Sequence, residues 1–475
     1  SEVSGSNGRL LTFTQLVERI VELLLLEIEQ RPQRFLIDLG LVFCFLYVMS
    51  SKSYKIPKQT KLTTEEVNEL LDDWTPEPLI SKQKKKKQAA SQKWNVVSSA
   101  AQGSFTIEGK SNAVHNFATN NFLGLAGDKE IIAECKKTIS KYGVGSCGPR
   151  GFYGTIDVHL NLENKLAKWL GTSDAIVYSY GFCTISSSIP AFSKRGDVII
   201  YDDGVNFATY QGIELSRSSI QSFKHNDMNE LERLLKEIVA KDKGRPVKNR
   251  RFIVINGVYE NYGDLAPLRR IVELKNKYKF RLIMDDSYGI GVLGKNGRGS
   301  VEHWGVDVNE IEILTGNIEN AFAAVGGFCT GSPQVVDHQR LAGLGYCFSA
   351  SLPPYISTAT IEAVRRIEES PQIVQSVAKN IRLMYEKFSD SLPQCLRLDG
   401  SLQAPVMHIR YKGTTDQEEI LTKFKCIVTK ALDENIAVVC PTYTEKEKNP
   451  PPPSIRLSLS AIHTEEEINE CVNVL

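Results

Sequence analysis

The 475-residue chain lacks the features that would point to a metal site, a disulfide framework or a nucleic-acid partner. Its ten cysteines include no Cys-x-x-Cys pair, and its seven histidines are equally dispersed. This scatter argues against a zinc site and for a reducing compartment. The 57 basic and 56 acidic residues leave a formal net charge of +1, so bulk electrostatics favour no acidic partner. We therefore expect no metal and no nucleic acid.

Lysine is missing from a long stretch of the chain, since none occurs between Lys295 and Lys379. Within this stretch, residues 312–331 read EILTGNIENAFAAVGGFCTG. The pattern predicts a buried strand, a polar turn that holds Asn320, and a second apolar strand opened by two glycines. The turn therefore carries an amide and has no lysine near it.

Residues 1–60 contain the longest apolar runs of the sequence. Residues 10–30 place apolar side chains at helical spacing among glutamates, which predicts an amphipathic helix that ends near Pro32. Residues 35–50 are almost continuously apolar apart from Asp38. This run is shorter than the roughly 20 residues that span a bilayer, but the lysines that follow favour a single membrane anchor with its following side cytoplasmic. A buried core helix or an interfacial helix is the alternative, whereas the acidic first segment argues against a signal peptide.

Residues 61–110 are predicted to form a linker that contains one helix. The segment 62–80, LTTEEVNELLDDWTPEPLI, predicts a helix capped by Thr63 or Thr64, followed by extended chain. A lysine run at 84–87 is typical of a solvated linker. Contact with anionic lipid headgroups is the functional alternative if the membrane anchor is real.

Beyond residue 110, short apolar strands alternate with amphipathic helices. The predicted strands are DAIVYSY (174–180), GDVIIYDD (196–203), RFIVINGVY (251–259), FRLIMDDS (280–287) and IEILTGN (311–317). This alternation implies an α/β fold with a mainly parallel sheet covered on both faces. We expect a large domain at 111–370 and a smaller C-terminal α+β domain at 371–475. The smaller domain has predicted strands at 405–412, 436–440 and 454–460.

Four segments fall where predicted strands end, which is where open α/β sheets bind ligands. Residues 142–163 are dense in glycine, and Gly181 opens a helix directly after a strand, a position suited to a phosphate. A buried strand ends in the adjacent carboxylates Asp285 and Asp286. The turn at Asn320 is the fourth segment.

Taken in this order, the four segments resemble the α-oxoamine synthase family of pyridoxal-phosphate-dependent transferases, which have fold type I. The resemblance extends from about residue 117 to residue 354. The phrases YGVGSCGPRGFYGTIDVHL and DHQRLAGLGYCFSASLPP resemble the serine palmitoyltransferase branch of that family. The fold implied is a large domain with a mainly parallel sheet and a smaller C-terminal domain.

The resemblance implies that this chain has lost the catalytic residues of the family. Asn320 corresponds to the lysine that holds the cofactor as a Schiff base, and an amide cannot form an imine. Phe207 and Tyr288 stand where active members carry histidines. Asp285 matches the carboxylate that keeps the pyridine nitrogen protonated, and we expect it to remain as a buried hydrogen-bonded group. The chain alone is therefore expected to be inactive and to hold no covalent cofactor.

The resemblance also implies a heterodimer, because fold type I enzymes form their active sites at the subunit interface. The expected partner is a related catalytic subunit that carries the lysine and holds the pyridoxal phosphate. Together the two chains would condense L-serine with palmitoyl-CoA to 3-ketodihydrosphingosine at the endoplasmic reticulum membrane. Small activating subunits and Orm-type regulators are expected near the membrane helix. The residues expected at the rim of the partner's active site are Gly145, Cys147, Gly148, Arg150, Phe348, Ser349 and Ser351.

Two readings stay open beside this one. The chain could be a membrane-tethered scaffold that takes no direct part in the active site, or an enzyme that binds the cofactor without an imine. Pro149 stands where active relatives have Ser or Thr, so Arg150 either contacts substrate or ties the loop to the chain. Cys147 is expected to pack at the subunit interface and not to act as a nucleophile.

Overall fold

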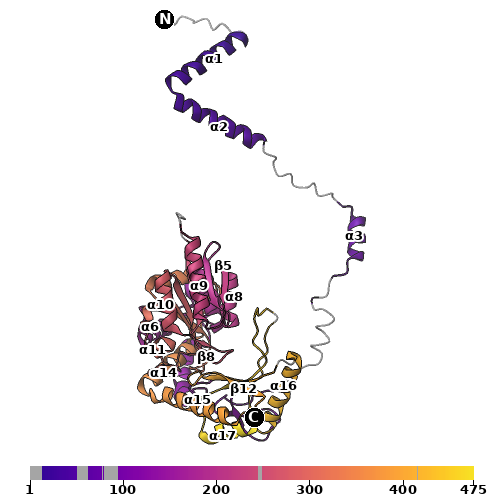
Figure 1. Cartoon of the computed structure of the whole chain (residues 1–475), viewed down its shortest axis with the longest axis vertical. Coiled ribbons are helices and arrows are strands. Elements are labelled where there is room, and N and C mark those ends of the chain that lie inside the picture. Colours follow the sequence, from indigo (N-terminus) through magenta and orange to yellow (C-terminus); the bar gives the residue numbers. More distant parts are fainter. Residues whose placement is uncertain are drawn as a thin grey trace. The chain divides into compact units, whose positions relative to one another are not determined.

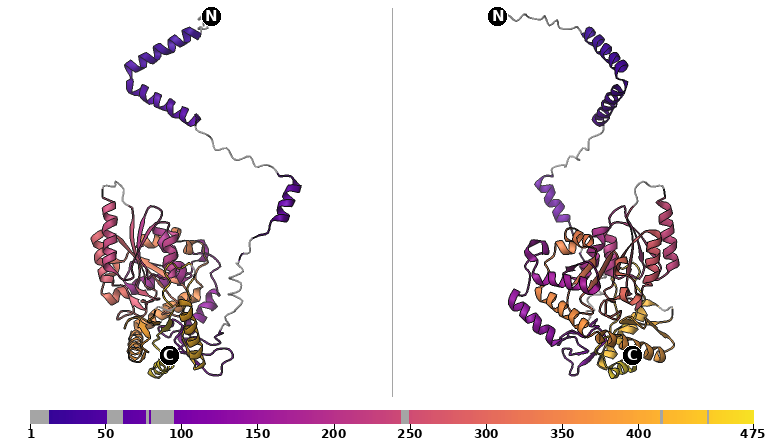
Figure 2. Two further views of the ribbon diagram at one scale, coloured as in Figure 1. Left: turned by 45° about the vertical axis from the view of Figure 1, so that its right-hand side comes forward. Right: turned by 90° about the vertical axis from the view of Figure 1, so that its left-hand side faces the viewer.

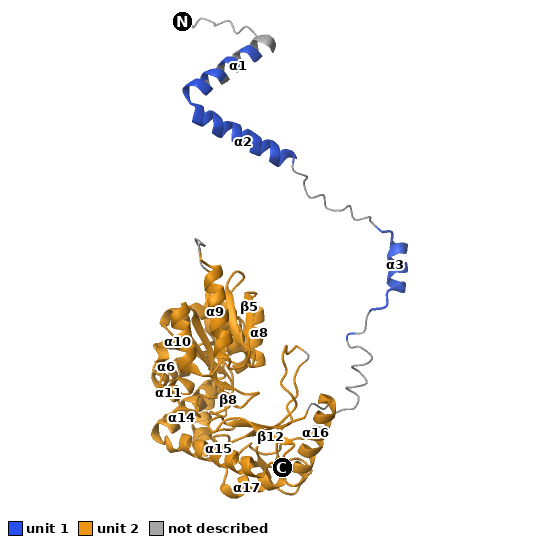
Figure 3. Cartoon of the chain, viewed as in Figure 1, with its two compact units in different colours: residues 1–92 blue, residues 93–475 orange. Residues whose placement is uncertain are grey.

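The computed structural model describes residues 13–50, 62–76, 79, 95–243, 249–413, 416–444 and 446–475. The chain divides into two compact units, Ser1–Gln92 and Lys93–Leu475, which we describe separately (Figure 3).

The described part of the first unit is helical. It contains α1 (Phe13–Gln30), α2 (Pro32–Ser50) and α3 (Thr64–Asp73). Proline can begin α2 without the loss of a hydrogen bond, because the first N–H of a helix has no partner within the helix. The predicted cap of α3 is confirmed at Thr63, whose side chain accepts from Glu66 N while Glu66 Oε2 accepts from Thr63 N at 2.8 Å.

α2 is the one described helix that is long and apolar enough to cross a membrane, judged by length and composition. Its acidic residue is paired within the helix, since Arg34 Nε lies 3.8 Å from Asp38 Oδ2 one turn away. Such a pair lowers the cost of carrying Asp38 into apolar surroundings. The lysine run at 84–87 lies outside the described residues.

The second unit is built on a seven-stranded sheet in the order β3-β11-β10-β9-β6-β4-β5 (Figure 1). The strands are β3 (Asp174–Tyr178), β4 (Val198–Asp202), β5 (Ser219–Phe223), β6 (Arg251–Asn256), β9 (Arg281–Asp285), β10 (Ile313–Asn317) and β11 (Gly327–Gly331). All neighbours are parallel except β11, which is antiparallel to β10 and β3. The five predicted strands and the strand after the glycine pair are confirmed. β5 escaped prediction because it is a short edge strand with polar side chains.

Helices cover both faces of this sheet, as the alternation of strands and helices predicts. The helices of the second unit are α5 (Lys129–Tyr142), α6 (Asp157–Leu170), α7 (Gly181–Phe192), α8 (Phe207–Leu215), α9 (Met228–Lys241), α10 (Leu268–Tyr278), α11 (Ser300–Trp304), α12 (Pro333–Ala342), α13 (Leu344–Cys347), α14 (Pro354–Glu369), α15 (Gln372–Ser391), α16 (Gln417–Asp433) and α17 (Glu465–Val474). Successive residues of β4 point to opposite faces, so Ile200 packs in one core with α9 and α10, whereas Ile199 packs in another with α7 and α8. Short turns of other helical type lie at Arg150–Gly154 and Val308–Glu310.

The C-terminal part of the second unit forms a separate three-stranded antiparallel sheet. Its strands are β12 (Leu396–Asp399), β13 (Val406–Tyr411) and β15 (Ile455–Ser458). With α15, α16 and α17 this sheet lies at one end of the unit, which is also visible in Figure 2. A two-stranded ribbon of β7 (Val258–Tyr259) and β8 (Asp264–Leu265) completes the fold.

One expectation for the C-terminal part of the second unit needs correction. The predicted strand at 436–440 is only β14 (Ile436–Ala437), and it pairs with β2 (Val114–Asn116) and not with β13. The linker expected at 61–110 stays a prediction; within that range, β1 (Ser104–Phe105) pairs with β2 in the second unit. The structure keeps Lys93–Leu475 as one compact unit, so the division at residue 370 stays a prediction.

Candidate functional site

A polar pocket of about 280 Å³ lies where the parallel strands end and α7 begins. β4, β6, β9 and β10 each end in a polar residue or reach one directly afterwards, so their carboxyl ends gather hydrogen-bonding groups. The lining includes Asn206, Phe207, Asp285, Tyr288 and Asn320. The structure therefore brings together the four degenerate positions that the sequence had singled out.

Asp285 ends β9 and is almost fully buried, with its carboxylate saturated by neutral donors of its own chain. Oδ2 accepts from Asn206 Nδ2 at 2.9 Å and from Asn256 Nδ2 at 3.1 Å, and Oδ1 accepts from Ser287 Oγ at 2.6 Å and from Thr315 Oγ1 at 3.2 Å. Burial raises the pKa of Asp285, and these hydrogen bonds act in the opposite direction. A pyridine N–H would have to displace one of them.

The neighbouring carboxylate, Asp286, does not line the pocket. It is fully buried and accepts from Ser300 N at 2.7 Å and from Ser300 Oγ at 2.6 Å. Burial raises the pKa of Asp286 to about 7. This residue anchors the turn after β9 and has no part in the pocket.

The side chain of Asn320 is held on both sides by amide and carbonyl groups. Its Nδ2 donates to Ser287 O at 2.9 Å, and its Oδ1 accepts from Asn120 Nδ2 at 3.2 Å. Asn120 Nδ2 also contacts Tyr288 Oη at 2.9 Å, and Asn120 Oδ1 accepts from Ser458 Oγ at 2.9 Å. Asn320 is thus part of a buried hydrogen-bond network that has no nucleophilic amine.

The two positions at which the resemblance implies histidines carry aromatic rings that do not titrate near neutral pH. Phe207 opens α8, and its ring faces Phe182 with centroids 6.1 Å apart. Tyr288 is buried against Phe122, and burial raises its pKa well above the ordinary range of tyrosine. Neither ring can act as a general base at pH 7 as an imidazole does.

One pocket residue escaped the sequence reasoning. Glu319 precedes Asn320 in the turn, and its Oε1 lies 3.4 Å from Gly181 N at the start of α7. The sequence does show an acidic residue in this turn, and it also predicts a phosphate-binding helix start at Gly181. Its partner is distant in sequence, so the contact itself was not visible there.

The two segments predicted to form the rim of a partner's site are joined in the structure. Gly148 O accepts from Ser351 N at 2.9 Å and from Ser351 Oγ at 3.0 Å, and Ser146 Oγ donates to Ser351 O at 3.0 Å. Gly154 folds back against this loop, where a Cβ would lie 2.0 Å from Gly148 O. The two rim segments are therefore held together by a tight turn that requires glycine at position 154.

The joined segments expose apolar side chains, with Phe348 at 75% and Tyr153 fully exposed. Cys147 and Tyr153 also adopt positive φ angles of 58° and 63°, a conformation that side chains other than glycine rarely take. We call the exposed set the rim patch. It consists of Val144, Cys147, Phe152, Tyr153, Leu344 and Phe348. Clustered apolar exposure of this kind marks an interaction surface.

The polar residues of the rim form hydrogen bonds to groups of their own chain. Arg150 is buried, and its NH1 and NH2 groups donate to Glu163 Oε1 and Oε2 at 2.8 and 2.9 Å. Ser351 is buried against Gly148 O, and Ser349 Oγ donates to a backbone carbonyl. Arg150 therefore ties the loop to α6 through the Glu163 carboxylate.

A charged cluster around His225 was not predicted from the sequence. His225 Nδ1 lies 2.7 Å from Asp202 Oδ1, and Nε2 lies 3.0 Å from Asp264 Oδ2. Its ring stacks on Tyr262 with centroids 4.2 Å apart. Burial alone would lower the pKa of His225, but the two carboxylates outweigh it and raise the pKa to about 9. The imidazole is therefore charged near neutral pH.

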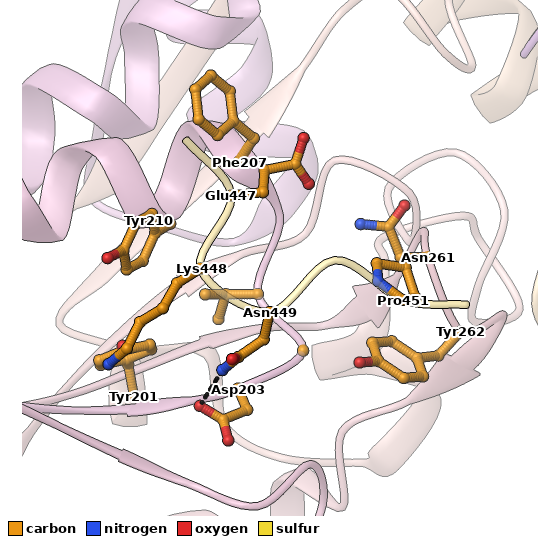
Figure 4. Close-up of a pocket in the computed structure, with 12 residues that line it drawn as sticks. Tyr201, Asp203, Phe207, Tyr210, Asn261, Tyr262, Glu447, Lys448, Asn449 and Pro451 are labelled. Atoms are coloured by element: carbon orange, nitrogen blue, oxygen red, sulfur yellow. Dashed lines mark hydrogen bonds between the residues drawn. The ribbon is translucent and has the colours of Figure 1, made fainter. Parts of the chain in front are cut away.

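A narrow pocket on the other side of Phe207 is closed by the segment before β15. Figure 4 shows the side chain of Lys448 extending toward Tyr201 and that of Asn449 pointing at Asp203. Asn449 Nδ2 donates to Asp203 Oδ1 at 3.2 Å and fastens the segment there. The free space of about 30 Å³ is enough for about one water molecule, so this pocket is closed to a substrate.

Within the described residues, no group of three or more His, Cys, Asp or Glu side chains has a metal-binding arrangement.

The comparisons with known proteins agree with this architecture. A family model for class I and II aminotransferases matches residues 112–475. The serine palmitoyltransferase of Sphingomonas wittichii superposes with a TM-score of 0.74 at 24% identity, over 84% of this chain and 97% of that one. A structure of serine palmitoyltransferase with an internal aldimine of pyridoxal phosphate gives 0.72 at 23%, over 82% and 94%. The chain has the fold type I architecture of pyridoxal-phosphate transferases and belongs to the class I and II aminotransferase family.

Relatives of known name narrow this assignment. The chain is 46% identical to long chain base biosynthesis protein 1b of Oryza sativa subsp. japonica, over 90% of this chain and 88% of that protein. It is 40% identical to serine palmitoyltransferase 1 of Dictyostelium discoideum, over 94% and 93%. It is 38% identical to serine palmitoyltransferase 1 of Saccharomyces cerevisiae, over 80% and 71%. Within its family, the chain belongs with the long chain base 1 proteins of serine palmitoyltransferase.

Proposed function

We propose that this chain is the non-catalytic subunit of a serine palmitoyltransferase. It pairs with the lysine-bearing long-chain base subunit 2 to condense L-serine with palmitoyl-CoA into 3-ketodihydrosphingosine, the first step of sphingolipid synthesis. The observation that carries the proposal is Asn320, a hydrogen-bonded amide at the place of the Schiff-base lysine. Pyridoxal phosphate is accordingly held by the partner.

The residues of this chain's own pocket do not fit the cofactor. Asp285 retains the carboxylate that a pyridine nitrogen requires, but Asn320 offers no amine and Phe207 no imidazole. A phosphate would bind best at the start of α7, but Glu319 already places a negative charge there. We therefore assign no catalytic step to this pocket.

The contribution of this chain to the working site is the rim patch with Gly145 and Gly148. Its apolar exposure suits burial against a second subunit, and the tight turn at Gly154 fixes its shape. Cys147, Phe348 and Ser349 lie on this surface, whereas Arg150 and Ser351 act from behind it by holding the two segments together.

The first unit serves as a single-pass anchor in the endoplasmic reticulum membrane, with the second unit on the cytosolic side. The length and apolar composition of α2 support this role, and so do the lysines that follow it in the sequence. Small activating subunits and Orm-type regulators would bind near this helix. The lysine run at 84–87 would contact anionic headgroups.

The proposal is tested by purifying the chain together with its catalytic partner. After reduction with borohydride, the phosphopyridoxyl adduct should map to a lysine of the partner and to no peptide of this chain. An adduct on this chain at stoichiometric level would contradict the proposal.

A scaffold without a direct part in the active site is the second candidate, favoured by the fact that Arg150, Ser349 and Ser351 are all bonded within the chain. Cys147→Glu, with Cys147→Ala as its control, separates the two. A direct role predicts lower partner activity per assembled complex, even where less complex co-purifies. Scaffolding alone predicts that assembly and activity are both unchanged.

A further inference from the structure

The pocket around Asn320 differs from a cofactor pocket in its charge as well as in its missing amine. Glu260, Asp285 and Glu319 bring three carboxyl groups to it, and among its described lining residues there is no lysine, arginine or histidine. The phosphate of pyridoxal phosphate carries roughly two negative charges at neutral pH. Such a group needs backbone donors or cations around it.

The backbone donor best placed to bind that phosphate is already in use. α7 is a helix of 12 residues that begins at Gly181, and its first N–H points at Glu319 Oε1. The turn that carries Glu319 crosses this helix end closely, since a Cβ on Gly181 would lie 2.8 Å from Asn317 Cβ. A carboxylate here takes the hydrogen bond and the favourable helix dipole that a phosphate would otherwise receive.

We infer that Glu319 closes this pocket to cofactors that carry a phosphate, so that restoring the lysine at position 320 is not enough to restore binding. Glu319 acts in two ways, by occupying the N–H of Gly181 and by repelling a second anion brought to the same helix end. The inference concerns this chain's own pocket and not the working site that we assign to the partner.

The test uses the full-length chain, co-purified with its partner, and four variants. Asn320→Lys is made alone and in combination with Glu319→Gln, Glu319→Ser or Glu319→Asp. Each complex is incubated with pyridoxal phosphate and reduced with borohydride, and the peptide that contains position 320 is quantified by mass spectrometry. The partner's own adduct serves as an internal reference for a folded complex.

Asn320→Lys alone should give little adduct, and adding Glu319→Gln or Glu319→Ser should increase it about tenfold or more. Glu319→Asp retains the charge and should not increase it. Pyridoxal, which lacks the phosphate, should show no such increase with any of the variants. Equal labelling of Asn320→Lys and its neutral double variants, at any level, would overturn the inference. An equal gain with pyridoxal or with Glu319→Asp would also overturn it. None of these outcomes bears on the partner's adduct, so failure here is distinct from failure of the proposed function.

Discussion

The buried pair of Arg150 and Glu163 holds the rim in place, and its removal allows a quantitative test. Their side chains are 3% and 5% exposed, and Glu163 Oε1 also accepts from Val177 N of β3 at 3.0 Å. Glu163→Gln keeps the shape but leaves the guanidinium without its counter-charge. Breaking a buried pair in this way costs about 3 kcal/mol, the lower end of the range for removing one partner, because the amide oxygen still accepts one hydrogen bond.

The expected change in melting temperature follows from the size of the second unit. About 380 residues unfold together in Lys93–Leu475, and at about 2.1 cal/mol/K each they give an unfolding entropy of roughly 0.8 kcal/mol/K. A loss of about 3 kcal/mol therefore lowers the melting temperature by about 4 °C.

Thermal unfolding of the full chain, followed by circular dichroism, measures this shift. The matched control is Glu369→Gln, which breaks a pair with Arg365 whose side chains are 57% and 41% exposed. Exposed pairs contribute about 0–1 kcal/mol, so the control should shift the melting temperature by about 1 °C or less. Equal shifts for the two variants would refute the view that Arg150 is a buried anchor of the rim.

Three further predictions concern the described contacts. The pKa of His225 is about 9 in the folded chain against 6.5 for an ordinary histidine, so its stabilisation is full below pH 6.5 and lost as the pH rises through 9. The melting temperature should therefore decrease as the pH is raised from 6.5 through 9, and His225→Asn should make it depend less on pH. The same pH dependence in His225→Asn as in the parent would contradict the raised pKa of His225. Gly154→Ala should disrupt the rim and weaken co-purification with the partner, because the added Cβ would collide with the carbonyl oxygen of Gly148. Gly151→Ala is the control: its Cβ would meet open space, so this variant should behave as the parent. Phe348→Glu should lower the affinity for the partner at least about tenfold by placing a charge in a buried interface, while Val239→Glu on α9 should leave it unchanged; equal affinities in a pull-down titration would exclude the rim patch from the interface.

Much of the architecture was predictable because its causes are local. The strands that became β4, β6, β9 and β10 are continuous apolar runs, and α9 and α10 are two of the amphipathic helices expected between them. β14 shows where this reasoning stops. Its sequence predicts a strand, but its partner β2 lies more than 300 residues away, and no local pattern specifies that pairing.

The site divides in the same way. Asn320, Phe207, Tyr288 and Asp285 were singled out by the family resemblance, and the structure places all four around one pocket. Arg150 was ambiguous, because a guanidinium binds a substrate or a neighbouring carboxylate equally well. Only its burial against Glu163 decides between them.

The amino-acid sequence by itself determined that this chain carries an amide and no amine at position 320, since that depends on the identity of one residue. The tertiary structure decided which groups meet: Ser351 with Gly148 across 203 residues, and Glu319 with Gly181 across 138. Hydrogen bonds and charges act over a few ångströms, and only the folded backbone brings residues so distant in the chain within that range.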